Sequence, residues 1–412
     1  MDGRRSPASP AALPAIWVVT RLALLLCVFK AVVFPGPDVT TDVSVIYQGW
    51  YDVLRTGTFP RDDVTWQYPP AAALAVLAPA LLPFLDYASA FFVLAFLADL
   101  AVLALLLAAG ARPGRSPIGA WVWVAGVPLL GPTVYARYDV MVTAVAVAAL
   151  LAGARRPRTM GALVGLGALL KVWPALLLAG AVRRRAWGAA AVTAGVLSAA
   201  FAVSMPGAFA FLAFQRDRGT EVESLGALVF HVARQFGWRG EVLLHYGSVE
   251  FLGPWVDEVS DAAVGLGALA CGWLLLWRLR AGRFAPHTLA DAAFTAVLLF
   301  TVTSRVISPQ YLVWLVGLAS VCLCFLTSRM GLPAALVLAA SLVTVLEFPV
   351  WFAHVVASDP LGVTLLFLRN GLLVAATVTA AVRLWRSTVP RPGDPAVLTG
   401  HSARAHGAPV SS

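Results

Sequence analysis

Apolar runs of roughly bilayer-spanning length recur along the chain, and short polar segments separate them. A helix needs about 20 mostly apolar residues to cross the hydrocarbon core of a membrane. Ten runs are candidate spans, at residues 13–34, 87–111, 118–134, 138–152, 187–205, 259–279, 288–303, 311–326, 331–348 and 361–384. The pattern predicts an all-α polytopic membrane protein with about 10–12 transmembrane helices.

Residues 71–84 are apolar but short, and they contain Pro79 and Pro83. A helix rises about 1.5 Å per residue, so this segment would barely cross a bilayer. If it did cross, Arg112 and Arg115 would lie outside, against the positive-inside rule. We therefore expect an interfacial or re-entrant helix here.

Residues 160–182 form an apolar run with an arginine cluster before it and another after it. Positive charge at both ends indicates that the run enters and leaves the membrane on the same side. Pro174 breaks a helix and restricts the residue before it. We predict a hairpin of two short helices, bent at residues 171–174.

Two long polar segments, residues 35–70 and 206–258, interrupt the apolar pattern on the exterior side. Each contains an amphipathic stretch, at residues 43–54 and 224–236, which predicts an interfacial helix. In the first stretch the apolar face at helical spacing comprises Val43, Ile46, Trp50 and Val53. We expect that helix to lie on the membrane surface.

Charge distribution sets the expected orientation. Most arginines lie in short connections between apolar runs, so both termini are expected in the cytoplasm. The pattern divides the chain into a cytoplasmic N-terminus at residues 1–12, a transmembrane domain at 13–385 and a disordered cytoplasmic tail at 386–412. The first run lacks a small-residue cleavage site and is expected to remain as a span.

Composition agrees with a membrane protein, because 60% of the residues are hydrophobic and 12% are charged. A soluble domain has about 25% charged residues. The formal net charge of +9 follows the membrane topology, so we expect a lipid bilayer and no nucleic acid as partner. The four cysteines and six histidines show no ligand spacing, and no metal or cofactor is expected.

The first exterior segment mixes acids with aromatic residues, so it can present carboxylates to a polar substrate at the membrane surface. Asp42 follows the first span and precedes the amphipathic stretch, and we predict that it is catalytic. Asp38 is the nearest other acid, and we expect it to bind substrate. The alternative is that these acids form a solvated loop face, which is the better interpretation for Asp62 and Asp63.

Arg137 and Asp139 lie at an exterior span boundary, where they could bind an anionic headgroup or form an interfacial ion pair. Lys171 lies within an apolar run, where a charge costs about 2.5–3.5 kcal/mol on insertion scales. It therefore faces a polar cavity or partner, or it reaches the interface along its own stem.

The second exterior segment supplies further candidates. Arginine binds phosphate with paired N–H donors, so Arg216 and Arg218, with Glu223 close by in sequence, are candidates for substrate binding. The alternative is that they form a solvated charge run. The exterior turn that contains Arg305 is short, which leaves few residues for a loop without a function. Arg305, Gln310 and Tyr311 are therefore further candidates for substrate binding. Glu347 and His354, near the last exterior turn, are weaker ones.

Short motifs follow one another in a fixed order: Thr41-Asp42, Gly57-Thr58-Phe59-Pro60, Tyr68-Pro69-Pro70, Arg137-Tyr138-Asp139, Leu170-Lys171-Val172-Trp173-Pro174, Arg218-Gly219 with Glu223-Ser224-Leu225, and Ser308-Pro309-Gln310-Tyr311. This set resembles the GT-C membrane glycosyltransferases, particularly the polyprenyl-phosphate-mannose-dependent enzymes of glycosyltransferase family 87 of actinobacteria. One departure is that Asp42 has no second acid within three residues, which argues against a metal site built on paired acids.

The resemblance implies a GT-C-like fold, a polyprenyl-phosphate donor that carries mannose, and a glycolipid or cell-envelope glycan acceptor. It implies transfer with inversion in the cell membrane, with the active site outside the cytoplasm. Asp42 would then take the acceptor proton as general base. Lys171, Arg218 and Arg305 would balance charge on the departing phosphate.

Two other functions remain open from the residues. A transporter or flippase for lipids or lipid-linked sugars would distribute ionisable residues through its spans and contain internal repeats. Here the polar groups gather on one side, which favours surface chemistry. A non-catalytic subunit of a cell-wall assembly would tolerate substitution of Asp42.

Overall fold

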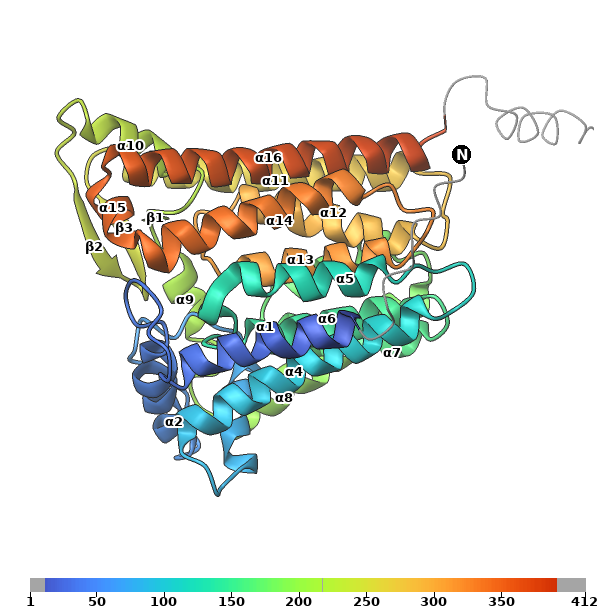
Figure 1. Ribbon diagram of the computed structural model, residues 1–412, viewed down its shortest axis with the longest axis horizontal. Helices are drawn as coiled ribbons and strands as arrows, with labels where there is room; N and C mark the ends of the chain where they lie inside the picture. Colours follow the sequence, from blue (N-terminus) through green and yellow to red (C-terminus); the bar gives the residue numbers. More distant parts are fainter. Residues whose placement is uncertain (1–11, 217, 391–412) are drawn as a thin grey trace, which may run out of the picture.

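The computed structural model describes residues 12–216 and 218–390 of the chain. Its long helices run side by side, and short helices and a small sheet gather at one end of them (Figure 1). The predicted termini at residues 1–12 and 386–412 lie largely outside the described residues. Within the described part, the last helix continues to Thr388, three residues beyond the predicted end of the transmembrane domain.

Five described helical segments are long and apolar enough to cross a membrane: α4 (Tyr87–Gly110), α8 (Arg184–Ser204), α11 (Val256–Arg280), α14 with η5 (Gly331–Val350) and α16 (Pro360–Thr388). Shorter helices pack between them: α1 (Ala12–Val28), α5 (Ile118–Gly126), η3 (Pro128–Val134), α6 (Asp139–Gly153), α7 (Pro157–Leu170), α12 (Thr288–Val302) and α13 (Tyr311–Leu323). The chain is therefore an all-α polytopic membrane protein, as predicted.

Two spans begin at aspartate caps. The Asp86 carboxylate accepts from the Ser89 N–H at 3.0 Å at the start of α4. The Asp359 carboxylate accepts from the Leu361 and Gly362 N–H groups, each at 3.0 Å, at the start of α16. Such caps satisfy N–H groups that have no partner inside the helix.

Both irregular apolar segments consist of short helical pieces. Residues 71–84 hold only two short pieces, α3 (Ala72–Leu77) and η2 (Ala78–Leu81). The predicted hairpin consists of α7 and η4 (Trp173–Gly180), and Lys171 between them is extended, with φ −159° and ψ 137°. The lysine thus lies at a break in the helical backbone.

The exterior layer begins with a helix at residues 42–54, made of η1 (Asp42–Tyr47) and α2 (Gln48–Leu54). Its buried face comprises Val43, Tyr47, Trp50 and Leu54 rather than the predicted set with Ile46 and Val53. The Tyr47 ring packs against Phe91 and Tyr138, with centroids 5.5 and 6.1 Å away. The helix therefore packs on the bundle, whereas the sequence predicted that this face would meet lipid.

The second exterior segment contains α9 (Phe211–Arg216), α10 (Leu228–Arg234) and a sheet that was not expected from the sequence. Strands β1 (Thr220–Glu221), β3 (Ser248–Leu252) and β2 (Glu241–His245) are antiparallel in that order. The two-residue turn at Tyr246 and Gly247 has positive φ at both residues, as hairpin turns of this length favour. Helix α15 (Phe352–Ala357) completes the layer.

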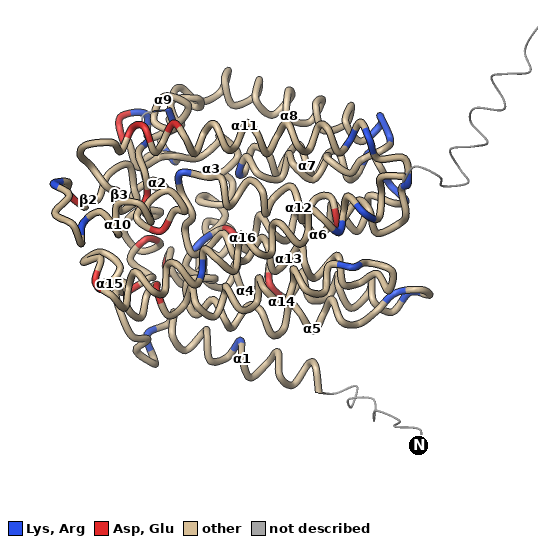
Figure 2. The backbone as a smooth tube through the Cα atoms, turned by 90° about the horizontal axis from the view of Figure 1, so that it is seen from above, with Lys and Arg blue, Asp and Glu red and all other residues tan. Residues whose placement is uncertain are grey.

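Acidic positions concentrate at the end of the bundle that carries the sheet, α2 and α15, and arginines dominate the connections at the other end (Figure 2). The start of α1 and the end of α16 lie at this second, basic end (Figure 1). This separation is the charge asymmetry on which the expected orientation rests.

A buried ion pair joins helices α1 and α4. Arg21 of α1 donates through Nε to Asp99 of α4 at 2.8 Å, and both side chains are at most 1% exposed. Asp99 also accepts from Trp123 Nε1 and the Tyr135 hydroxyl, each at 2.6 Å, and from Trp17 Nε1 at 3.4 Å. The aspartate is thus surrounded by donors, which a buried charge requires.

Candidate active site

A cavity of about 560 Å³ lies beneath the exterior layer. Its wall comes from six parts of the chain: the first exterior segment, Arg137 before α6, the bend at Lys171, the second exterior segment, the turn between α12 and α13 with the helix ends beside it, and the residues Phe348 and Phe352 near α15. Its size is that of a small-molecule site. Chain segments far apart in sequence therefore meet here.

Asp42 lies in the cavity wall at the start of η1 and is paired with Arg137. The distance from Arg137 Nη2 to Asp42 Oδ2 is 2.5 Å, and the Asp42 side chain is 35% exposed. Arg137 also donates through Nη1 to the carbonyls of Ala136 and Val39, at 2.8 and 3.2 Å. Burial alone would lower the pKa of Arg137, but the Asp42 carboxylate raises it, so the guanidinium stays charged.

Lys171 reaches the cavity from the helix break and is held by Asp139. Its Nζ lies 2.6 Å from Asp139 Oδ1, which also accepts from Trp314 Nε1 at 2.7 Å. Four aromatic rings surround the ammonium, with centroids 4.9–5.5 Å away: Tyr68, Tyr138, Tyr311 and Trp314. Their faces attract a cation, so the ammonium is fixed inside a mostly apolar wall.

Tyr68 is a neutral member of this wall. Burial, reinforced by the charge of Asp139, raises the pKa of Tyr68 to about 12. The phenol therefore keeps its proton at neutral pH and can donate a hydrogen bond to a ligand.

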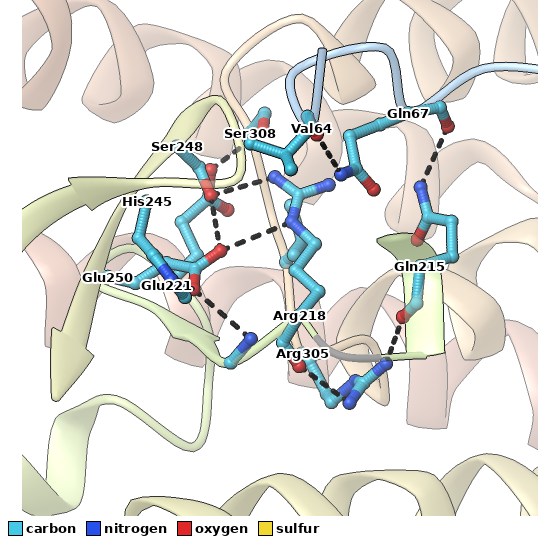
Figure 3. A network of polar contacts seen from close by, with 12 residues as sticks. Val64, Gln67, Gln215, Arg218, Glu221, His245, Ser248, Glu250, Arg305 and Ser308 are labelled. Carbon is cyan, nitrogen blue, oxygen red and sulfur yellow. Dashed lines mark hydrogen bonds and ion pairs between the residues drawn. The ribbon is translucent and has the colours of Figure 1, made fainter. Parts of the chain in front are cut away.

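Arg218 is held by the sheet (Figure 3). Its Nη2 donates to the Ser248 hydroxyl at 2.8 Å, and its Nε lies 3.3 Å from Oε1 of the fully buried Glu250. Glu250 also accepts from the Gly219 N–H at 3.1 Å and from Ser248 at 2.8 Å, and it contacts His245. The sheet thus fixes the direction of one guanidinium at the cavity.

Arg305 lies in the cavity wall but is largely engaged with the backbone (Figure 3). It donates to the carbonyls of Arg218 and Gln215 at 2.7 and 2.8 Å, and to the Ser260 hydroxyl at 3.2 Å. Burial, with the nearby Arg218 charge, lowers the pKa of Arg305. Through these hydrogen bonds, Arg305 connects the turn after α12 to the second exterior segment.

The model for glycosyltransferase family 87 matches residues 66–309, more than half of the chain. The chain belongs to glycosyltransferase family 87. It is therefore a membrane glycosyltransferase, which moves a sugar from a donor to a glycan acceptor. Comparisons with curated proteins and with solved structures find no significant match. The matched region starts after Asp42 and ends just before Gln310 and Tyr311, so the assignment of these three rests on other grounds.

The structure of this family 87 glycosyltransferase brings together most of the residues singled out from its sequence. Those that line the cavity are Asp42, Arg137, Lys171, Arg218, Glu223, Arg305, Gln310 and Tyr311. Asp139 lies behind Lys171 and holds it. Asp38 and Arg216 do not occur among the described lining residues, and Asp38 instead pairs with Lys30 at 2.8 Å.

The structure of the glycosyltransferase also adds polar residues that the sequence analysis did not assign to the site, namely Gln67, Tyr68, Glu221, Ser248 and Glu250. Tyr68 and Glu221 lie within motifs or charge runs that the sequence shows. Ser248 and Glu250 became visible only with the hairpin, which an alternating pattern flanking Tyr246-Gly247 could have predicted.

Proposed function

We propose that this enzyme transfers a sugar, mannose by its family resemblance, from a polyprenyl-phosphate donor to a hydroxyl of a glycolipid or cell-envelope glycan, with inversion at the anomeric carbon. The observation that supports this most is one cavity with an accessible carboxylate, Asp42, and fixed cations around it. We place the reaction at the outer face of the cell membrane, because the arginine-rich end of the bundle is expected in the cytoplasm and the acidic end is the opposite one.

Asp42 has the role of general base in this proposal. As the acceptor oxygen attacks the anomeric carbon, its proton passes to the Asp42 carboxylate, and the bond from that carbon to the phosphate oxygen breaks. The electron pair of that bond leaves with the lipid phosphate. Arg137 orients the carboxylate through its ion pair.

The departing phosphate gains negative charge, which Lys171 and Arg218 are placed to balance. Each cation has its own acid, Asp139 and Glu250 respectively, which fixes its position before substrate binds. Arg305 adds positive charge nearby while its N–H groups hold the backbone. Fixed cations of this kind need little reorganisation when charge develops.

Apolar residues that line the cavity could contact the polyprenyl chain of the donor. Val172, Leu212 and Phe300 line the cavity, yet they are 56%, 59% and 37% exposed. Exposed apolar residues at a cavity mouth suit an acyl or prenyl chain that continues into lipid. We therefore expect the phosphate inside and the polyprenyl chain leaving past these side chains.

The test is transfer of radiolabelled mannose from polyprenyl-phosphate-mannose to membrane glycolipids, by purified wild type, Asp42→Asn and Asp52→Asn. Asp52 is an exposed acid on the same exterior helix and is the matched control. We expect wild-type transfer, near-normal transfer by Asp52→Asn and a loss of about 10²–10⁴-fold for Asp42→Asn.

Full transfer by a folded Asp42→Asn would remove Asp42 from the mechanism and direct attention to Asp38 or Asp139. If the wild type transfers no sugar from any lipid-linked donor but moves such lipids between leaflets of a vesicle, the flippase alternative replaces this proposal.

A further inference from the structure

A group of acids forms another part of the cavity wall. Glu221 and Glu223 line the cavity but are only 3% and 4% exposed, and Glu223 lies beside Glu347. The fully buried Arg369 lies among them: its Nη2 is 2.9 Å from Glu347 Oε1 and donates to the Glu223 carbonyl at 2.7 Å. Three acids thus share one nearby buried arginine.

Among the carboxyl oxygens of this group that lack hydrogen-bond partners, two belong to residues that line the cavity. Oε1 of Glu221 accepts from the Ser308 hydroxyl at 2.9 Å (Figure 3). Oε2 of Glu221 and Oε1 of Glu223 have no hydrogen-bond partner among the described residues. Buried polar atoms are rarely left without a partner, because removing them from water is costly. A ligand that brings hydroxyl groups into the cavity would satisfy both.

The protonation of the group suits hydroxyl recognition. Burial raises the pKa of Glu223 well above its ordinary value, and the neighbouring Glu221 and Glu347 raise it further. A protonated Glu223 both donates and accepts, as a sugar hydroxyl does. Burial also raises the pKa of Glu221, while Arg218 acts in the opposite direction. The carboxyl groups in the wall thus offer acceptor oxygens to a sugar hydroxyl, and any one that is protonated can also donate.

We propose that Glu221 and Glu223 hold the sugar ring of the donor through its hydroxyl groups and restrict the donor to a sugar without a carboxylate. This inference rests on the proposed function. It assigns the cations Lys171 and Arg218 to the phosphate and the glutamates to the sugar. A uronic acid would bring a further negative charge beside Glu223, whose pKa the neighbouring acids Glu221 and Glu347 already raise.

The first test pairs donor analogues with enzyme variants. Wild type, Glu221→Gln, Glu223→Gln and the exposed control Glu241→Gln are assayed with a polyprenyl-phosphate hexose and its 2-, 3-, 4- and 6-deoxy analogues. We expect at least one deoxy analogue to lose about 10- to 100-fold in kcat/KM with the wild type and control. That loss shrinks to about twofold in the variant that lacks the matching acid.

Donor choice gives a second result from the same proteins. Wild type is expected to discriminate against a polyprenyl-phosphate hexuronic acid, and Glu221→Gln and Glu223→Gln are expected to narrow this preference at least about tenfold. Unchanged deoxy losses and unchanged discrimination in both folded variants would overturn the inference, since a purely structural role would lower all donors equally.

Binding separates this inference from the transfer reaction. In thermal unfolding, the wild type should gain more stability from the polyprenyl-phosphate hexose than from polyprenyl phosphate alone, and the two variants should lose that extra gain. Sugar-dependent protection without transfer would overturn the proposed function and support the subsite. Transfer with equal protection of wild type and both variants would overturn the subsite and support the function.

Discussion

Two aspartate–arginine pairs, Asp99 with Arg21 and Asp42 with Arg137, differ in how fully the aspartate is satisfied by hydrogen-bond donors. Asp99, between the helices, accepts from Arg21 and from three further side chains, and it is fully buried. Asp42, at the cavity, has Arg137 as its ion-pair partner and remains 35% exposed. The same two residue types therefore make a closed pair in one place and an open pair in the other.

The difference indicates what each pair can do. A carboxylate whose oxygens already accept several hydrogen bonds holds helices in place and has little capacity for another proton. A carboxylate with accessible oxygen surface can take a proton from a substrate. Lys171 and Asp139 lie between these extremes, because the aspartate is closed by Trp314 while the lysine faces the cavity.

The largest expected effect comes from removing the Asp99 charge from its buried pair with Arg21. Asp99→Asn leaves Arg21 buried without a counter-charge and should lower the free energy of unfolding by about 3–5 kcal/mol. Asp42→Asn should lower it by less, because the Asp42 carboxylate is 35% exposed and Arg137 keeps its hydrogen bonds to two carbonyls. Thermal unfolding in detergent measures both. Equal losses would show that the two pairs do not differ as described.

The buried histidine His231, with both ring nitrogens in hydrogen bonds, allows a test of how stability depends on pH. His231 Nε2 donates to the Val222 carbonyl at 2.8 Å, and Nδ1 accepts from the Ser358 hydroxyl at 2.7 Å. Burial lowers the pKa of His231 to about 4, so between pH 4 and 6.5 the unfolded state binds more protons. Stability should fall over that range as pH drops, by up to about 3 kcal/mol.

The control for the histidine is the more exposed His354, which pairs with Asp359. The difference in unfolding free energy between pH 6.5 and 4 should shrink in His231→Gln and stay near the wild-type value in His354→Gln. An unchanged pH dependence in His231→Gln would contradict the assignment of a neutral, closed imidazole.

The next effect concerns Arg218, a cation in the wall of the cavity. Arg218→Lys keeps the charge but loses the paired contacts with Ser248 and Glu250. We expect the KM for the donor to rise roughly tenfold while the folded yield stays near normal. Steady-state kinetics measure this. A KM that does not change would show that the sheet does not position this cation for substrate.

The smallest effect lies far from both pairs. Asp86→Ala removes the cap of α4 and should lower the free energy of unfolding by about 1 kcal/mol. Transfer per folded molecule should remain at the wild-type value. A loss of transfer would indicate that the start of α4 affects the cavity, and that stability and activity are less separate than the two pairs suggest.

The sequence predicted elements whose signal is local. The apolar pattern predicted the span that became α4 to within a residue at its end, and Pro174 with flanking arginines predicted the break at Lys171. Periodicity also located the helix after Asp42 but misassigned its buried face, because the packing of Tyr47 on Phe91 depends on a distant helix.

Partners far apart in sequence could not be predicted in this way. Asp99 lies within a uniformly apolar run, and nothing near it indicates Arg21 as its partner. The link from Glu250 to Arg218 depends on the sheet, whose strands are short. By contrast, the candidate site was largely assembled from motifs, because charged residues in such an apolar chain are few enough to single out.

The pair between Arg21 and Asp99 also bears on how the chain enters the membrane. Arg21 precedes its partner by 78 residues, so the ribosome delivers the arginine in α1 well before the aspartate in α4. A lone arginine near the middle of a helix costs about 2.5–3.5 kcal/mol on insertion. Stable insertion of α1 thus depends on its surrounding apolar residues until α4 arrives, and the same ion pair that joins these two helices in the finished bundle couples their insertion.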